Sequence, residues 1–294
     1  MNSILSFLPL FSAFTWAISG TILKKFKIKN LYLFPAFESC ISFIALSSMN
    51  FYLNRWNEFF SYETQIYTAF TISYSLSALG MIIYIQAIKR TELGIVFTIT
   101  TSIQVLIIAL LDKYINLLQF NSLFTIGAVG IISGVVAINF PHLKSLKNRQ
   151  QNKNDLFGII ASLLCGAFWA GNAFIADRTL NSASVIDATM IRTLLTFTYF
   201  VPINLFQYNE IKLTTTKKEI KYLIIAALFV TISMLIWNGS LKVNTGSWTT
   251  VLSSSAPIFA LTLGYIFLKE KLKSNEFTGI CICLLGVLLI IFSE

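Results

Sequence analysis

Long apolar runs separated by short charged segments make up most of the sequence. Eight runs carry no charged residue, and they cover residues 3–23, 64–88, 93–111, 114–141, 156–176, 222–241, 243–268 and 277–293. Two further runs, 31–53 and 188–207, carry one charge each, Glu38 and Arg192. At about 1.5 Å per helical residue, each run is long enough to cross a hydrocarbon core of about 30 Å. The pattern predicts an all-α integral membrane protein with ten transmembrane helices.

The composition agrees with this prediction. Of 294 residues, 55% are hydrophobic and 12% are charged, whereas soluble domains are about 25% charged. The net charge of +9 comes from lysines and arginines between the apolar runs, so we expect no nucleic-acid partner. The four cysteines lie inside apolar runs and the single histidine, His142, lies in a loop, so we expect no metal site and no cofactor.

The hydrophilic segment 142–155 divides the chain into two halves of five helices, residues 1–141 and 156–294. The halves share features in a fixed order. Trp16 and Tyr84 precede Trp169 and Trp237 by 153 residues, and glycines 127 and 134 precede glycines 279 and 286 by 152. Because five crossings is an odd number, the second half enters the membrane from the opposite side. We therefore expect an inverted repeat, which in transporters places the substrate site near the midplane.

Charges between the helices predict the orientation. The odd-numbered loops carry 17 lysines and arginines and the even-numbered loops carry four. The positive-inside rule therefore places segment 142–155 in the cytoplasm and both termini outside. The G-x-x-x-G step at Gly130 and Gly134 allows close helix packing, which we expect within one chain rather than in a dimer. The chain is expected to be a monomer or a weak dimer.

Several short motifs of the sequence resemble those of a known family. Residues 237–242 (WNGSLK), Gly246, residues 256–260 (APIFA) and residues 268–272 (LKEKL) are similar to the drug/metabolite transporter superfamily, EamA type. Residues 168–172 (FWAGN) resemble the start of the sixth helix in that family. The resemblance covers nearly the whole chain. It implies ten helices in two inverted repeats, a transporter of small metabolites and termini in the cytoplasm, which is the reverse of the orientation that the charges predict.

Two charges lie inside the predicted membrane helices. An ionisable group there costs roughly 2.5–3.5 kcal/mol, so a function or a structural pairing with a neighbouring helix must explain Glu38 and Arg192. Each lies about 10 Å inside the helix that carries it, from opposite sides of the membrane. Extended side chains would just meet, or would leave room for a zwitterion between them, and Glu38 is a candidate proton carrier. Charges at helix ends, such as Asp187, are expected to snorkel or face water.

Aromatic residues and amides complete the candidate binding site. Some membrane tryptophans form belts at the interface, but pairs related by the repeat and placed mid-helix are also suited to line a central cavity. The expected substrate-binding residues are Trp16, Glu38, Tyr84, Trp169, Asn172, Arg192, Trp237 and Asn238. Pro257 removes one backbone hydrogen bond, so the ninth helix should be interrupted near it.

These observations predict a secondary active transporter, an exporter of small organic metabolites such as amino acids, that works by alternating access. No GxxxxGK[ST] loop is present, and the few ionisable groups do not form a catalytic set, so we do not expect an enzyme. The alternatives are an uptake carrier for a cationic or nucleotide-derived metabolite, a non-transporting membrane protein and an intramembrane enzyme. The expected location is the inner (plasma) membrane of a bacterium, with the lipid bilayer and a small-molecule substrate as partners.

Overall fold

The computed structural model describes residues 5–26, 32–90, 93–148, 153–206, 217–269 and 274–292. Within these ranges the chain is helical and contains no strand. The elements are η1 (Leu5–Phe7), α1 (Leu8–Phe26), α2 (Leu33–Tyr52), α3 (Trp56–Ser61), α4 (Thr64–Ile88), α5 (Leu93–Tyr114), α6 (Ser122–Asn148), α7 (Lys153–Leu180), α8 (Val185–Phe206), α9 (Lys217–Val243), α10 (Gly246–Ser253), α11 (Ala256–Leu268) and α12 (Ser274–Ile291). The all-α membrane class is confirmed.

Six stretches of the described chain are long and apolar enough to cross a membrane. They are Leu5–Leu23, Thr64–Ile88, Val96–Tyr114, Leu156–Leu180, Ile220–Val243 and Gly246–Phe267. Shorter apolar windows, Ser122–Ile138 and Phe277–Ile291, lie in α6 and α12. Helices α2 and α8 are not in either group because polar and charged side chains interrupt them, Glu38 and Asn50 in α2 and Asp187 and Arg192 in α8. Length and hydropathy alone thus support six of the ten expected spans.

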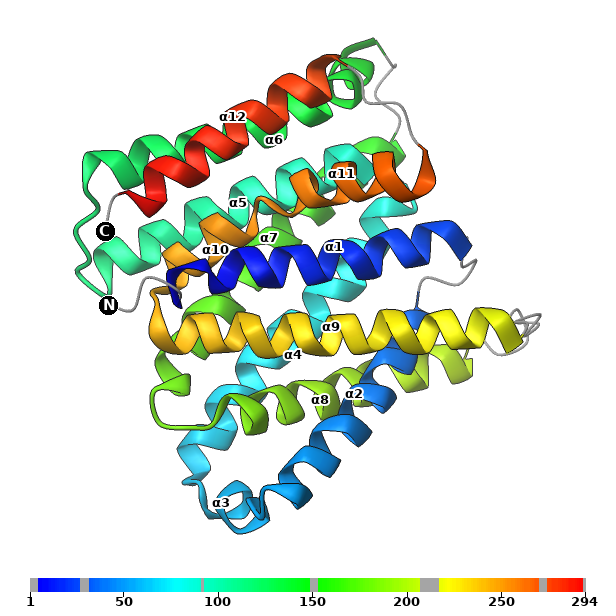
Figure 1. Ribbon diagram of the computed structural model, residues 1–294, viewed down its shortest axis with the longest axis vertical. Helices are drawn as coiled ribbons and strands as arrows, with labels where there is room; N and C mark the ends of the chain where they lie inside the picture. The colour runs from blue at the N-terminus through cyan, green and yellow to red at the C-terminus, as the bar shows by residue number, and fades with distance from the viewer. Residues whose placement is uncertain are drawn as a thin grey trace.

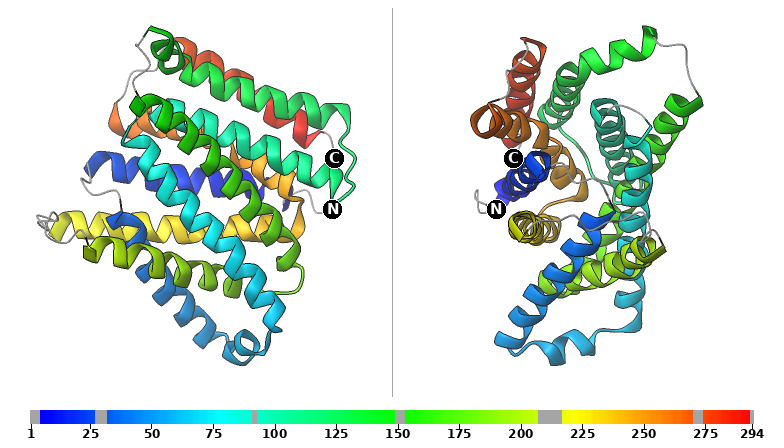
Figure 2. Two further views of the ribbon diagram at one scale, coloured as in Figure 1. Left: turned by 180° about the vertical axis from the view of Figure 1, so that it is seen from behind. Right: turned by 90° about the vertical axis from the view of Figure 1, so that its right-hand side faces the viewer.

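The helices form a bundle of adjacent pairs (Figures 1 and 2). Helix α6 packs on α12, α4 on α7, α1 on α9, and α2 on α8. Figure 1 shows the α6–α12 pair along one edge of the bundle and the α2–α8 pair toward the other edge, where the short helix α3 lies. Most of segment 142–155 is helical. Helix α6 continues past its apolar run to Asn148, and α7 begins at Lys153, before its own apolar run.

Glycines set the distance between α6 and α12. A Cβ atom at Gly127 would lie 2.7 Å from the carbonyl oxygen of Gly286, and one at Gly286 would lie 2.7 Å from that of Gly127. The same reciprocal 2.7 Å relation joins Gly134 and Gly279. No other residue type fits this separation, because real Cβ atoms do not approach backbone oxygen so closely. The glycines of α6 therefore pack against α12 within the same chain.

The expected interruption of the ninth predicted helix is present between α10 and α11. Helix α10 ends at Ser253 and α11 begins at Ala256, with Pro257 in its first turn. Proline lacks an N–H group, so the preceding turn has unpaired carbonyl groups. The hydroxyl of Ser254 donates to the carbonyl of Thr250 at 2.8 Å, and that of Ser255 donates to the carbonyl of Leu252 at 2.7 Å. Both carbonyls also accept from a backbone N–H group, that of Ser254 at 3.0 Å and that of Ser255 at 3.1 Å, so the hydroxyls add second donors beside the break.

The glycine contact of α6 with α12 gives a first testable prediction. Gly134→Ala places a methyl group against the Gly279 carbonyl and the Cys283 sulfur, so it should lower the free energy of unfolding by about 1–3 kcal/mol. Gly20→Ala is the matched control, because a Cβ at Gly20 would meet nothing within 4 Å. Thermal unfolding in detergent measures both. A Gly134→Ala protein with the same melting temperature as the wild type would contradict this account of the interface.

Candidate functional site

Glu38 of α2 and Arg192 of α8 form an ion pair inside the bundle. The Arg192 Nη1 atom lies 3.2 Å from the Glu38 Oε1 atom, and their side chains are 13% and 3% exposed. The two helices run antiparallel and touch along their length, so residues that are far apart in sequence meet (Figure 2). The side chains meet directly, which is one of the two arrangements expected from the sequence.

The Glu38 carboxylate has a second partner. Ser42, one turn further along α2, donates a hydrogen bond to Glu38 Oε1 at 2.9 Å. The Ser42 hydroxyl also lies 2.5 Å from the hydroxyl of Thr231 on α9. A buried ion pair is favourable only when further hydrogen bonds satisfy its lone pairs. These hydroxyl groups provide that support and connect α2 to α9.

A second polar chain lies beside the first. The Tyr74 hydroxyl of α4 donates to Asn238 Oδ1 at 3.2 Å, and Asn238 Nδ2 donates to the Thr189 hydroxyl at 2.9 Å. Thr189 lies on α8, one turn before Arg192. Ser73, adjacent to Tyr74, donates to the backbone and side-chain oxygens of Asn172 at 2.9 and 3.0 Å.

Four of the predicted site residues, Glu38, Asn172, Arg192 and Asn238, thus take part in side-chain hydrogen bonds between helices. These bonds involve α2, α4, α7, α8 and α9. The sequence predicted which polar residues belong to the membrane interior, and the fold decides which of them share a network.

The four predicted aromatic residues occupy other places. Trp169 of α7 packs against α4, where its ring is 5.4 Å from that of Tyr84 and its Nε1 donates to the Ser77 carbonyl at 3.3 Å. Trp237 packs against two apolar clusters between α9 and its neighbours. Trp16 is half-buried in α1. No contact among the described residues joins these rings to the Glu38–Arg192 pair, so their role as cavity walls stays a prediction.

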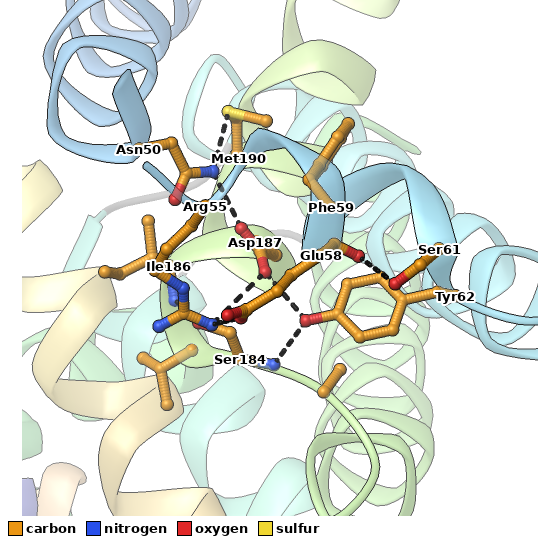
Figure 3. Close-up of polar contacts among 12 residues, drawn as sticks. Asn50, Arg55, Glu58, Phe59, Ser61, Tyr62, Ser184, Ile186, Asp187 and Met190 are labelled. Atoms are coloured by element: carbon orange, nitrogen blue, oxygen red, sulfur yellow. Dashed lines mark hydrogen bonds and ion pairs between the residues drawn. The ribbon is translucent and has the colours of Figure 1, made fainter. Parts of the chain in front are cut away.

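Asp187 was expected to face water at a helix end, and this expectation is wrong. Its side chain is fully buried in the first turn of α8. Asn50 Nδ2 donates to Asp187 Oδ1 at 2.7 Å, the Tyr62 hydroxyl donates to Oδ2 at 2.7 Å, and Arg55 Nη2 lies 3.8 Å from Oδ2 (Figure 3). The positive end of the helix dipole also favours a carboxylate there. Asp187 therefore connects the start of α8 to the segment between α2 and α4.

Tyr62 holds the Asp187 carboxylate from the segment between α3 and α4. Its hydroxyl accepts a hydrogen bond from the Ser184 backbone N–H at 3.0 Å while donating to Asp187. Burial raises the pKa of Tyr62 to about 12, against an ordinary value near 10. The phenol therefore keeps its proton and remains a donor at every physiological pH.

A second buried carboxylate was also not singled out from the sequence. Asp112, near the end of α5, is fully buried and accepts hydrogen bonds from the backbone N–H and the hydroxyl of Ser247 and from Asn116. Asp177 of α7 accepts from the N–H of Gly246 at 3.2 Å. The two carboxylates thus bind consecutive N–H groups at the start of α10. The Ser247 hydroxyl adds a side-chain donor to this contact.

Comparison with known proteins shows what the chain is similar to. Residues 156–292 match the EamA-like transporter family. The match covers the second half of the chain. The chain is also 27% identical over 208 residues to the uncharacterized transporter YetK of Bacillus subtilis, with 69% of this chain and 59% of that protein covered. It is 24% identical over 215 residues to an uncharacterized transporter of Archaeoglobus fulgidus, with 72% and 71% covered.

The resemblance to EamA-type transporters that the sequence suggested is confirmed. An uncharacterized protein of Methanocaldococcus jannaschii is 27% identical over 136 residues, which are 46% of this chain and 97% of that protein. One solved crystal structure superposes on the chain with a TM-score of 0.81 and 13% identity, covering 98% of this chain and 96% of the other. That likeness supports the fold alone. The described residues contain no cluster of three potential metal ligands.

The contacts of Asp187 give a second prediction. Tyr62→Phe removes the donor to a buried carboxylate and the acceptor of the Ser184 N–H, so it should lower the free energy of unfolding by about 1–3 kcal/mol. Tyr52→Phe is the matched control, since Tyr52 is 84% exposed. Differential scanning fluorimetry in detergent compares the two variants. Equal melting temperatures would show that Asp187 does not depend on the phenol.

Proposed function

We propose that this EamA-type transporter is a secondary active exporter of small organic metabolites such as amino acids, working by alternating access between two halves of five helices. Membership of a transporter family and transporter-named relatives support the general function. The lack of a GxxxxGK[ST] loop in the sequence favours transport driven by a gradient rather than by ATP. The proposed location is a bacterial inner membrane.

Reciprocal contacts support the inverted repeat. If α1, α2, α4, α5 and α6 correspond to α7, α8, α9, α10–α11 and α12, then the α1–α9 contact corresponds to α7–α4, and the α1–α11 contact to α7–α5. All four contacts are present, and the α2–α8 and α6–α12 contacts correspond to themselves. A two-fold axis produces this pattern, because each contact then recurs with its partners exchanged. The relative from Methanocaldococcus jannaschii, matched over nearly its full length by about half of this chain, also favours a repeated unit.

Figure 1 gives a further argument for an even number of crossings. The start of α1 and the end of α12 lie at the same end of the bundle, as Figure 2 also shows. With α10 and α11 counted as one broken span and α3 as a short connecting helix, the proposed topology has ten crossings. This arrangement favours two inverted halves of five.

The Glu38–Arg192 ion pair is the observation that carries the proposal. The two residues are 154 positions apart, close to the 153 that separates Trp16 from Trp169 in the two halves, so they hold nearly the same position in each half. A pair formed by equivalent positions lies on the two-fold axis, which passes through the midplane where such repeats bind substrate. An anion and a cation held together there can bind the amine and carboxylate ends of an amino acid. We propose that the substrate separates the pair, and that Glu38 takes up a proton in the cycle.

The third prediction tests this role. Glu38→Gln keeps the acceptor for Ser42 and Arg192 but removes the charge. We expect it to lower amino-acid flux in proteoliposomes by about tenfold or more, a change in barrier of roughly 1.4 kcal/mol. Folded yield should stay close to that of the wild type. The matched control is Glu63→Gln, because Glu63 is exposed at the start of α4.

A purely structural ion pair would give the opposite result, with folded yield falling as far as flux. Saturable flux is itself the first requirement, because a channel or scaffold would not saturate with concentration. The solute panel includes cationic amines and nucleotide derivatives beside amino acids. Flux of those solutes alone would replace the proposed substrate class and leave the carrier function intact.

The fourth prediction concerns orientation. The charge distribution places the connection between α6 and α7 in the cytoplasm. A cysteine placed at Asn148, with the four native cysteines replaced by serine, should resist an impermeant maleimide in intact cells and react after the membrane is opened. Rapid labelling in intact cells would show that the termini, instead, lie in the cytoplasm.

A further inference from the structure

The contact between α2 and α8 has the same construction at both ends. Asn50 and Asn204 are separated by the same 154 positions as Glu38 and Arg192, so they too are equivalent in the two halves. Asn50 donates to Asp187 at the start of α8, and Asn204 Nδ2 donates to the Tyr32 carbonyl at the start of α2 at 2.9 Å. Each asparagine thus binds the beginning of the opposite helix.

Other equivalent residues strengthen this relation. Lys89 follows α4 and places its Nζ atom 4.4 Å from the centre of the Tyr32 ring. Lys242, its counterpart near the end of α9, donates to the Ala183 carbonyl just before α8 at 2.8 Å. The start of each of the two helices is therefore bound by an asparagine from one neighbouring helix and a lysine from another.

The asparagines lie far from the ion pair in opposite directions. Asn50 and Asn204 each follow the charged residue of their own helix, Glu38 or Arg192, by 12 positions, which is about 18 Å along an α-helix. Because α2 and α8 are antiparallel, the two asparagine contacts lie on opposite sides of the pair. Each is near one end of a hydrocarbon core of about 30 Å.

The two ends differ in chemistry. At the Asn50 end, a buried carboxylate, the Tyr62 phenol and Arg55 hold α8 to the α3 segment (Figure 3). At the Asn204 end, a backbone carbonyl and the Tyr32 ring, 6.2 Å from that of Phe200, hold α8 to α2. Both ends also contain buried apolar clusters, and the Asn50 end contains the Arg55–Asp187 ion pair. The hydrogen bonds and ring contacts at both ends can be replaced by water or by another rotamer. Such contacts can open without separating a close-packed backbone.

The α6–α12 interface offers the contrast. The proposed repeat exchanges α6 and α12 and so maps this interface onto itself. It is built from glycines in backbone contact, and separating these backbones loses packing contacts that nothing replaces. When the two halves move relative to each other, the polar interface should therefore open before the glycine interface does. Rigid-body rocking of one half against the other needs one interface of each kind.

We propose that the α2–α8 interface holds the two gates of the transporter. The Asn50 latch (Asn50, Asp187 and Tyr62) closes one side of the membrane, and the Asn204 latch (Asn204 and Tyr32) closes the other, with the Glu38–Arg192 pair between them. The inference rests on the proposed alternating-access function. In this structure both latches are formed, so both routes to the ion pair along this interface are closed. With the orientation given by the charges, the Asn204 latch faces the cytoplasm.

The experiment measures the labelling rate of a cysteine buried beside each latch. Ala188→Cys reports on the Asn50 end, since Ala188 is fully buried in the same cluster as Leu46 of α2. Ala36→Cys reports on the Asn204 end, since Ala36 is 7% exposed in the same cluster as Phe200 of α8. Both are made in a protein whose native cysteines are replaced by serine. A small maleimide is then applied to the purified full chain in detergent.

We expect Asn50→Ala to raise labelling of the Ala188→Cys reporter about tenfold, the effect of losing one or two hydrogen bonds from the closed state, and to leave the Ala36→Cys reporter unchanged. Asn204→Ala should do the reverse. Asn275→Ala is the matched control, because Asn275 also donates to backbone carbonyls of another helix, those of Ala137 and Ile138, but at the glycine interface. It should change neither reporter.

Two results would overturn the proposal. One is a rise at both reporters with either asparagine variant, which would mean general loosening, and the other is no rise at all. If alanine lowers folded yield, Asn50→Ser and Asn204→Ser are used, with the same expectation. The labelling needs no substrate, so its outcome is separate from that of the flux assay. Side-specific labelling without flux would refute the proposed function alone, and flux without side-specific labelling would refute the gates alone.

Discussion

The contact between Glu38 and Arg192 is the interaction on which the arrangement of α2 and α8 depends. Neither charge is stable alone in the membrane interior, where water cannot solvate it. The two helices must therefore cross with these side chains within reach of each other. Hydroxyl groups of Ser42 and Thr231 continue the network into α9. The same requirement explains why α2 and α8 are less apolar than their neighbours.

The two interfaces that the proposed repeat maps onto themselves have opposite physical character. The α6–α12 interface is held by glycine backbones in direct contact, so its stability comes from dispersion over a close fit. The α2–α8 interface is held by an ion pair and by asparagine, tyrosine and lysine contacts near its ends. A bundle with one close-packed and one polar interface has a natural place to bend. This asymmetry connects the fold to the alternating access proposed for the transporter.

Part of the structure could be predicted from the sequence because it depends on local stereochemistry. Pro257 cannot donate a backbone hydrogen bond, and the chain breaks between α10 and α11 beside it. Glu38 and Arg192 could be selected from the sequence because a charge in an apolar run is costly. Their similar depths, about 10 Å inside their helices from opposite sides of the membrane, predicted that they lie close together. Asp187 and Asp112 were not found in this way. Each lies near the end of a helix, where a carboxylate usually faces water, and nothing next to it in the sequence signals burial.

The sequence by itself determined the class of protein, the position of most helices and the charges that must be neutralised inside the bundle. These follow from local properties: apolar run length, proline and glycine stereochemistry, and the cost of a charge in hydrocarbon. Only the tertiary structure decided the partners. Asp187 meets Asn50 and Tyr62 from 137 and 125 residues earlier, and Asp112 meets Ser247 from 135 residues later. Such pairings depend on how helices cross, and helix crossing is set by the packing of the whole bundle rather than by any single segment.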